Sequence, residues 1–305
     1  MNKSEILQQI GISKFPNGIE LDYLNNSLFM RLTSSAISRN MQEDASAFES
    51  WIFCLKFKKY SRLEISKVQL DWENIQVMNG HYRRFLYRVN KLIQMCSNWF
   101  DIEPSKKVEL LIFSESLKCG LFLNYPINDS KKNLSGISES SIEESFVTHS
   151  KLYKGIIFDV QNHQLPVGVF KKSVSRGNEF FTAGKSAIDL WGIKNDEFWI
   201  FELKYLNRKV GILSELLFYM WVMEDVFLLK SDIYYPDLTQ SCLDRSKRSF
   251  DLLYKHEFEK IIGILLIDSL HPLVSEHILM QINKLLGANL EMKIQKYDVN
   301  PLRLV

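Results

Sequence analysis

The sequence has few cysteines, and nothing in their spacing ties them to a metal or to a disulfide framework. Its 305 residues include four, scattered without a Cys-x-x-Cys pair, and its six histidines lack the His-Glu-x-x-His spacing of zinc enzymes. This pattern argues against a zinc site and against a disulfide-bonded secreted domain. We therefore expect a reduced, cytoplasmic compartment.

A transmembrane-length apolar segment and a strong net charge are also missing. The apolar run at residues 210–227 is interrupted by Glu215, Glu224 and Asp225 and is too short to span a bilayer, so we expect no membrane association. The first residues lack the apolar stretch of a signal peptide. A net charge of +2 argues against a uniformly basic nucleic-acid coat, so any nucleic-acid surface must be local.

The common nucleotide-binding and hydrolase motifs are absent. The sequence contains neither Gly-x-Ser-x-Gly nor Gly-x-Gly-x-x-Gly. Gly184-Lys185-Ser186 resembles part of a P-loop, but the preceding Gly177 lies two residues too far back and a strand is expected to follow. We therefore discount an NTPase. Lys185 remains a candidate contact to a substrate phosphate, with a solvated lysine as the alternative.

What the sequence does contain is a predicted β-hairpin that carries three ionisable side chains. Residues 198–204 are apolar except for Glu202 and Lys204, which share one face because strand side chains alternate. A two-residue turn at Asn195-Asp196 would pair Lys194 with Glu197. The same register places Asp189 opposite Glu202.

Two carboxylates in that register need a compensating charge or proton. Their Cβ atoms would lie about 5 Å apart, and the ionised groups would repel by roughly 3 kcal/mol at an effective dielectric of about 20. A shared proton, Lys204 or a bound cation would offset this, and hard oxygen ligands suit Mg²⁺ or Mn²⁺. The alternatives are a solvated Glu-x-Lys face or a buried structural ion pair.

The run at 210–227 predicts a buried helix directly after the hairpin. Glu215 and Tyr219 are four residues apart and so lie on one helix face. Glu215 would pair either with the nearby Arg208 or Lys209, or with the hairpin site.

An Asp, then Glu-x-Lys on a hairpin, then a helix with Glu-x-x-x-Tyr resembles the PD-(D/E)XK nuclease superfamily over residues 140–270. Ile188 stands where the motif has proline, and Glu215 where glutamine is commoner in the exonuclease branch. The resemblance implies an α/β, restriction-endonuclease-like core with a mixed central sheet flanked by helices. It also implies Mg²⁺- or Mn²⁺-dependent hydrolysis of DNA, leaving 3′-hydroxyl and 5′-phosphate ends.

Roles for individual residues follow from this resemblance. Asp189, Glu202 and the Leu203 carbonyl would hold the metal, Lys204 would orient the attacking water, and Glu215 and Tyr219 would support the site. Nucleic-acid contacts are expected from the cations near the hairpin, Lys185, Arg208 and Lys209. We expect an endonuclease of bacterial restriction or anti-phage defence. The alternatives are a non-cleaving nucleic-acid-binding module, or an effector that is silent without a sensor or ATPase partner.

The family usually opens its core with a helix that carries a further acidic residue. Residues 138–146 fit such a helix, with Glu144 as the candidate. Ser141 with Glu144 would also make a capping box, in which case Glu143 would be the active-site residue. DNA is the expected substrate, RNA is left open, and a homodimer is a further possibility.

Composition divides the chain at a polar linker, residues 126–141, between an α+β accessory domain (1–125) and a nuclease-like domain (142–305). In the first domain we expect strands at 48–57, 63–70 and 108–113, and a helix at 81–96. Arg84 and Arg88 lie at helical spacing on that helix, where they would contact phosphates or form a solvated face. In the second we expect strands at 164–170, 180–189, 261–267 and 290–297, and a helix at 273–286.

Overall fold

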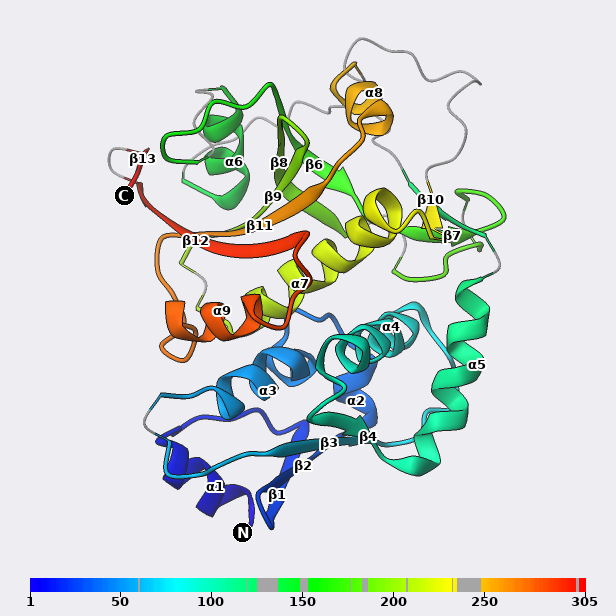
Figure 1. Ribbon diagram of the computed structural model, residues 1–305, viewed down its shortest axis with the longest axis vertical. Coiled ribbons are helices and arrows are strands. Elements are labelled where there is room, and N and C mark those ends of the chain that lie inside the picture. Colours follow the sequence, from blue (N-terminus) through cyan, green and yellow to red (C-terminus); the bar gives the residue numbers. More distant parts are fainter. Residues whose placement is uncertain are drawn as a thin grey trace. The chain divides into compact units, whose positions relative to one another are not determined.

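The computed structural model describes residues 1–59, 61–118, 120–124, 137–148, 153–175, 177–182, 186–206, 208–231, 233–234, 248–299 and 302–305 (Figure 1). The chain forms two compact units. Unit 1 comprises Met1–Lys118, Lys209–Glu215 and His271–Leu285, and unit 2 comprises Cys119–Arg208, Leu216–Leu270 and Leu286–Val305. Both are mixed α/β, a class that the sequence predicted for the C-terminal domain, whereas it predicted an α+β arrangement for the N-terminal one. In the described part of the chain, no helix is long and apolar enough to cross a membrane.

The division differs from the expected one. It falls at Lys118 and Cys119, ahead of the predicted linker, and two segments of the C-terminal half count with unit 1. Within the expected linker, residues 126–136 lie outside the described residues. A chain that returns twice to its first unit leaves no compositional signal at those crossings, so the sequence could not have indicated them.

Unit 1 contains a four-stranded sheet in the order β1-β2-β3-β4. β1 and β2 are antiparallel, and β2, β3 and β4 are parallel. The strands are β1 (Ile19–Leu24), β2 (Ser27–Leu32), β3 (Lys67–Trp72) and β4 (Phe100–Ile102). The helices are α1 (Lys3–Ile10), α2 (Ser34–Ile37), α3 (Phe48–Lys56), α4 (Gly80–Cys96), α5 (Lys107–Leu117) and α9 (Glu276–Asn283).

Two predicted strands of unit 1 are helices. The strand expected at 48–57 is α3, in which every residue from Phe48 to Leu55 is buried. A short helix that is buried on all sides has a continuous apolar sequence, so periodicity does not distinguish it from a buried strand. The strand expected at 108–113 is α5, where Val108, Leu111 and Ile112 follow helical spacing on an exposed face. The helix predicted at 81–96 is confirmed as α4, and the strand predicted at 63–70 begins later, as β3.

Unit 2 is built on a six-stranded mixed sheet in the order β13-β12-β11-β9-β8-β6. β6, β8 and β9 are antiparallel neighbours, while β11 runs parallel to both β9 and β12. The strands are β6 (Val160–Pro166), β8 (Ala187–Lys194), β9 (Glu197–Lys204), β11 (Lys260–Ile267), β12 (Leu290–Val299) and β13 (Leu302–Leu304). A smaller sheet contains β5 (Leu121–Leu123), β7 (Val169–Lys171) and β10 (Ile233–Tyr234).

Helices cover both faces of the six-stranded sheet, which explains the continuous apolar sequence of its central strands. Ile142 and Phe146 of α6 (Glu139–Thr148) pack on one face, in a cluster that includes Phe201. On the other face lies α7 (Gly211–Met223), and a Cβ added to Gly263 would come within 2.4 Å of the Met220 sulfur. Figure 1 shows α6 and α7 on opposite sides of these strands.

The predicted turn and register of the hairpin are confirmed, although the pairing of β8 with β9 ends at Leu190 and Phe201. β8 and β9 are joined by the two-residue turn Asn195-Asp196, Asn195 has a φ of 51°, and Lys194 pairs with Glu197. Beyond it, α7 continues into a π-helix at Glu224–Leu228, α8 spans Arg248–Lys255, and the strands predicted at 261–267 and 290–297 are β11 and β12. The first two predicted core strands are displaced: β6 begins earlier than 164, and β8 begins only at Ala187.

Candidate active site

Asp189 lies where strand pairing is interrupted on both of its sides. Pairing of β8 with β9 stops at Leu190 and Phe201, one position short of Asp189 and Glu202. Pairing with β6 passes from His163–Leu190 directly to Leu165–Ile188 and omits Gln164, the residue opposite Asp189.

Gln164 has a φ of 52°, in the left-handed region. A non-glycine residue in this region costs roughly 1–2 kcal/mol, and such strain occurs often at functional sites.

The interruption leaves room for the side chains of the hairpin to converge. The Asp189 carboxylate turns along β9, where Oδ2 accepts a hydrogen bond from the Leu203 backbone N–H at 2.8 Å. Glu202 and Lys204 are buried, whereas the Asp189 side chain is 18% exposed. The site therefore has a buried wall and one carboxylate that is reachable from solvent.

Three oxygen atoms surround the Lys204 ammonium. Nζ donates hydrogen bonds to Glu202 Oε1 and, at 3.0 Å, to the Leu203 carbonyl. Asp189 Oδ2 lies 3.9 Å from the same nitrogen. These are the three groups that the resemblance assigns to a metal, and here they converge on one positive charge. The expected convergence of Asp189, Glu202 and Lys204 on one face of the hairpin is present.

The donor set fits a hard divalent cation. The described residues, those of the hairpin included, contain no group of three or more His, Cys, Asp or Glu side chains that could hold a metal ion. Mg²⁺ does not need such a group, because it is usually bound by one or two carboxylates together with waters and substrate phosphates. Two carboxylates and a carbonyl agree with this coordination preference of Mg²⁺. They differ from the tetrahedral nitrogen and sulfur ligands of structural zinc sites.

Glu143 of α6, rather than Glu144, contacts the residue that lies opposite Asp189. Glu143 is buried and accepts a hydrogen bond from Gln164 Nε2 at 2.8 Å. Burial raises the pKa of Glu143 above its ordinary range, against the opposing effects of Gln164, His163 and Lys204. The Glu144 side chain is 59% exposed, with Oε2 3.9 Å from His163 Nε2.

The expected capping box of Ser141 with Glu144 is wrong. The backbone N–H of Ser138 donates to Ser141 Oγ at 2.8 Å, and the N–H of Ser141 donates to Ser138 Oγ at 3.2 Å. The cap therefore lies one turn earlier than predicted, because α6 already begins at Glu139. Capping consequently does not account for Glu144.

The raised pKa of Glu143 predicts a pH-dependent effect of Glu143→Gln. A carboxyl whose pKa is higher in the folded state binds more protons there, so its contribution to stability falls as pH rises above the ordinary value of about 4.3. The glutamine amide of the variant does not titrate, so the variant does not lose stability in this way as the pH rises. We expect the melting temperature of the variant, relative to the parent protein, to increase as the pH rises from about 4.3 through the raised pKa of Glu143, and then to level off.

Scanning calorimetry across that pH range measures the difference, with Glu144→Gln as the matched control on the exposed side of α6. A difference that stays constant with pH, or that falls, would contradict the assignment of a raised pKa to Glu143.

Glu215 and Tyr219 both lie on α7 and are buried. Glu215 is buried, counts with unit 1 and accepts a hydrogen bond from Gln42 Nε2 at 2.5 Å, a partner far away in the sequence. Arg208 is exposed and donates from Nε to Ser269 Oγ at 3.2 Å, and Lys209 is also exposed. Tyr219 is buried in unit 2, with its ring against Phe218.

Arg84 and Arg88 are buried, so they do not form the solvated face that was one alternative for them. Arg88 pairs with Glu49 of α3 and donates to the Ser46 carbonyl at 2.8 Å. Arg84 lies 3.1 Å from His81 Nδ1. α3 supplies the buried carboxylate that pairs with Arg88. The prediction missed this because it took α3 for a strand. Lys185 lies outside the described residues.

Three residues beyond the predicted set fix the chain after Lys204. Glu139 Oε1 accepts from the Tyr205 N–H at 3.2 Å, and Asp268 Oδ2 accepts from the Leu206 N–H at 3.2 Å. Tyr297 Oη donates to the Lys204 carbonyl at 2.9 Å. Asp268 directly follows β11, which is parallel to β9, and a polar residue at that strand end was a usable signal. The sequence gave no comparable sign for Tyr297.

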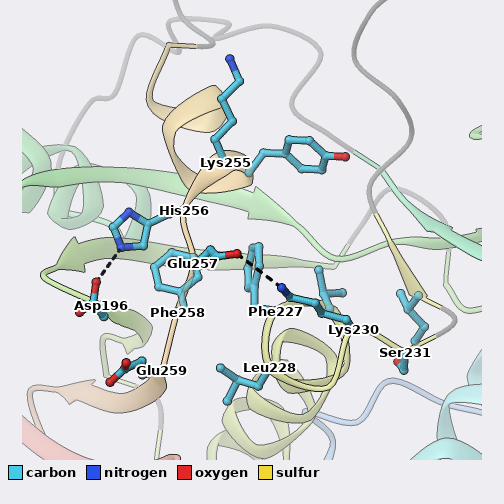
Figure 2. Close-up of a pocket in the computed structure, with 13 residues that line it drawn as sticks. Asp196, Phe227, Leu228, Lys230, Ser231, Lys255, His256, Glu257, Phe258 and Glu259 are labelled. Atoms are coloured by element: carbon cyan, nitrogen blue, oxygen red, sulfur yellow. Dashed lines mark ion pairs between the residues drawn. The ribbon is translucent and has the colours of Figure 1, made fainter.

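A cavity of about 840 Å³ lies elsewhere in unit 2, at the turn end of the hairpin, where Asp196 lines it. Figure 2 shows two close pairs among its side chains: His256 lies 3.8 Å from Asp196, and Lys230 lies 3.7 Å from Glu257. None of the predicted site residues lines this cavity. The carboxylates of Asp189 and Glu202 therefore do not belong to this cavity.

Comparison of the chain with protein-family models, with curated proteins and with solved structures finds no match.

Proposed function

We propose that this protein has a restriction-endonuclease-like core and hydrolyses phosphodiester bonds in DNA as a Mg²⁺-dependent endonuclease of bacterial restriction or anti-phage defence. The observation that carries the proposal is the convergence of Asp189, Glu202 and the Leu203 carbonyl on one cationic position. Support comes from the order of elements: α6 with a buried acid, then β6, the β8–β9 hairpin and α7. This order agrees with the resemblance to PD-(D/E)XK nucleases.

A purely structural ion pair explains this arrangement less well. Burying charged groups is expensive, and replacing a buried ion pair with apolar residues is often neutral or stabilising. β9 is otherwise apolar from Phe198 to Leu203, so such residues would fit the strand. Buried charges beside a strained backbone position are typical of functional sites.

Each residue has a definite task in this chemistry. Asp189 and Glu202 would supply carboxylate oxygens, and Leu203 its carbonyl, to Mg²⁺ or Mn²⁺. When bound, such a cation supplies a water of lowered pKa and stabilises negative charge on the leaving oxygen. Lys204 would donate hydrogen bonds to the attacking water or to the phosphate, where negative charge develops. Tyr297 would hold Lys204 in place through its backbone carbonyl.

The test is incubation of the purified protein with supercoiled plasmid, linear DNA and RNA, with Mg²⁺, Mn²⁺ or EDTA. The proposal predicts nicked or linear plasmid with a divalent cation and intact plasmid with EDTA.

Degradation of linear DNA alone would indicate an exonuclease, and degradation of RNA alone would change the substrate class. An intact plasmid together with measurable metal binding would favour an effector that needs a partner. An intact plasmid without metal binding would favour a non-cleaving module.

A further inference from the structure

The Lys204 ammonium occupies the position to which the metal ligands point. Its nitrogen donates to Glu202 Oε1 and to the Leu203 carbonyl, and Asp189 Oδ2 completes the set at 3.9 Å. A divalent cation bound to the same oxygens would lie within a few ångströms of this nitrogen. Two positive charges so close repel strongly, and the burial of Glu202 and Lys204 weakens the screening by water.

The same oxygens cannot serve both cations fully. A carboxylate oxygen that accepts a charge-assisted hydrogen bond from an ammonium has less electron density available to coordinate a metal. We propose that Lys204 competes directly with the divalent cation, holding the ligand oxygens in the metal-free protein and leaving them when the metal binds. This inference rests on the proposed function, because it takes the same oxygens as metal ligands.

If Lys204 competes with the metal, the nucleic-acid substrate should promote metal binding. A displaced ammonium needs another anion, and the phosphodiester that approaches the metal provides one. Nucleic acid that draws Lys204 away from Glu202 would remove the competitor, so metal and substrate should bind with positive coupling. The protein alone would then hold Mg²⁺ weakly, and the loaded site would form mainly on an anionic substrate.

The experiment is calorimetric titration of MgCl₂ into the full-length protein in the absence of nucleic acid. It compares the parent protein with Lys204→Gln and Lys204→Met. The glutamine amide still donates to Glu202, so Lys204→Gln should fold even if Lys204→Met does not. Lys194→Met is the matched control, because Lys194 lies at the turn end of the same hairpin and pairs with Asp159.

We expect Lys204→Gln to bind Mg²⁺ at least about tenfold more tightly than the parent protein, as removal of a neighbouring like charge should allow. Lys194→Met should bind as the parent does. A second readout is the melting temperature, which should rise more with added Mg²⁺ for Lys204→Gln than for the parent.

Three outcomes would overturn the inference in distinguishable ways. If the parent and Lys204→Gln bind Mg²⁺ with equal affinity while Asp189→Asn loses binding, the metal site exists but the competition does not. If none of the proteins binds Mg²⁺, the metal site of the proposed function fails, and the inference fails with it. Tighter binding by Lys194→Met as well would show a general charge effect and would also contradict direct competition.

Discussion

Asp189→Asn is expected to lower the rate of DNA cleavage at least about 100- to 1000-fold, the range found when one group that stabilises transition-state charge is removed. The asparagine side chain keeps an oxygen that can accept the Leu203 N–H, so the hairpin should keep its shape. The lost negative charge weakens metal binding at the more exposed of the two carboxylates. Lys204→Ala should have a comparable effect on cleavage, through loss of the group that orients the water.

The measurement is plasmid cleavage under single-turnover conditions, with circular dichroism to verify folding. Asp159→Asn is the matched control, because Asp159 contacts Lys194 at 3.1 Å at the opposite end of the hairpin and should be dispensable. Full Mg²⁺-dependent activity in Asp189→Asn, or in the larger truncation Asp189→Ala, would refute the assignment of this residue.

Arg88→Met is expected to reduce the free energy of unfolding by about 3–5 kcal/mol, because it leaves the buried Glu49 carboxylate without its cation. Glu49 would retain the hydrogen bond from Ser214 Oγ, at 2.9 Å, which satisfies one oxygen but does not neutralise the charge. Changing both partners, as Arg88→Met with Glu49→Leu, should recover much of this loss, since an apolar pair carries no buried charge.

Denaturant unfolding measures the change, and Lys118→Met is the matched control. Lys118 pairs with Glu115 on the exposed side of α5, so its loss should cost less than about 1 kcal/mol. If Arg88→Met were as stable as the parent and instead bound DNA more weakly, Arg88 would be a phosphate contact after all.

The chemistry of the hairpin could be predicted because it depends on local rules. The two-residue turn at Asn195-Asp196 fixes the register, and the register predicts Asp189 and Glu202 at facing positions of the hairpin. The interruption of pairing at Gln164 could not be predicted, because no residue type there demands a positive φ. Glu143 was preferred to Glu144 only when burial was known, since both fit a helix start.

Unit 1 was harder to predict for a physical reason. α3 is buried on every side, and its apolar run carries no amphipathic period that would distinguish a helix from a strand. That error also concealed the partner of Arg88, because a buried Glu49 was not expected in a strand. Pairings between distant segments, such as Gln42 with Glu215, have no signal in a single sequence.

Diffraction from crystals soaked in MnCl₂, measured for anomalous scattering, tests the central claim most directly. The proposed site predicts a manganese peak between the carboxylates of Asp189 and Glu202 and beside the Leu203 carbonyl, with the Lys204 ammonium moved away from Glu202. If Mn²⁺ were absent from the hairpin, with Lys204 still bound to Glu202 at saturating metal, the three side chains would be a structural ion pair and the nuclease proposal would be contradicted.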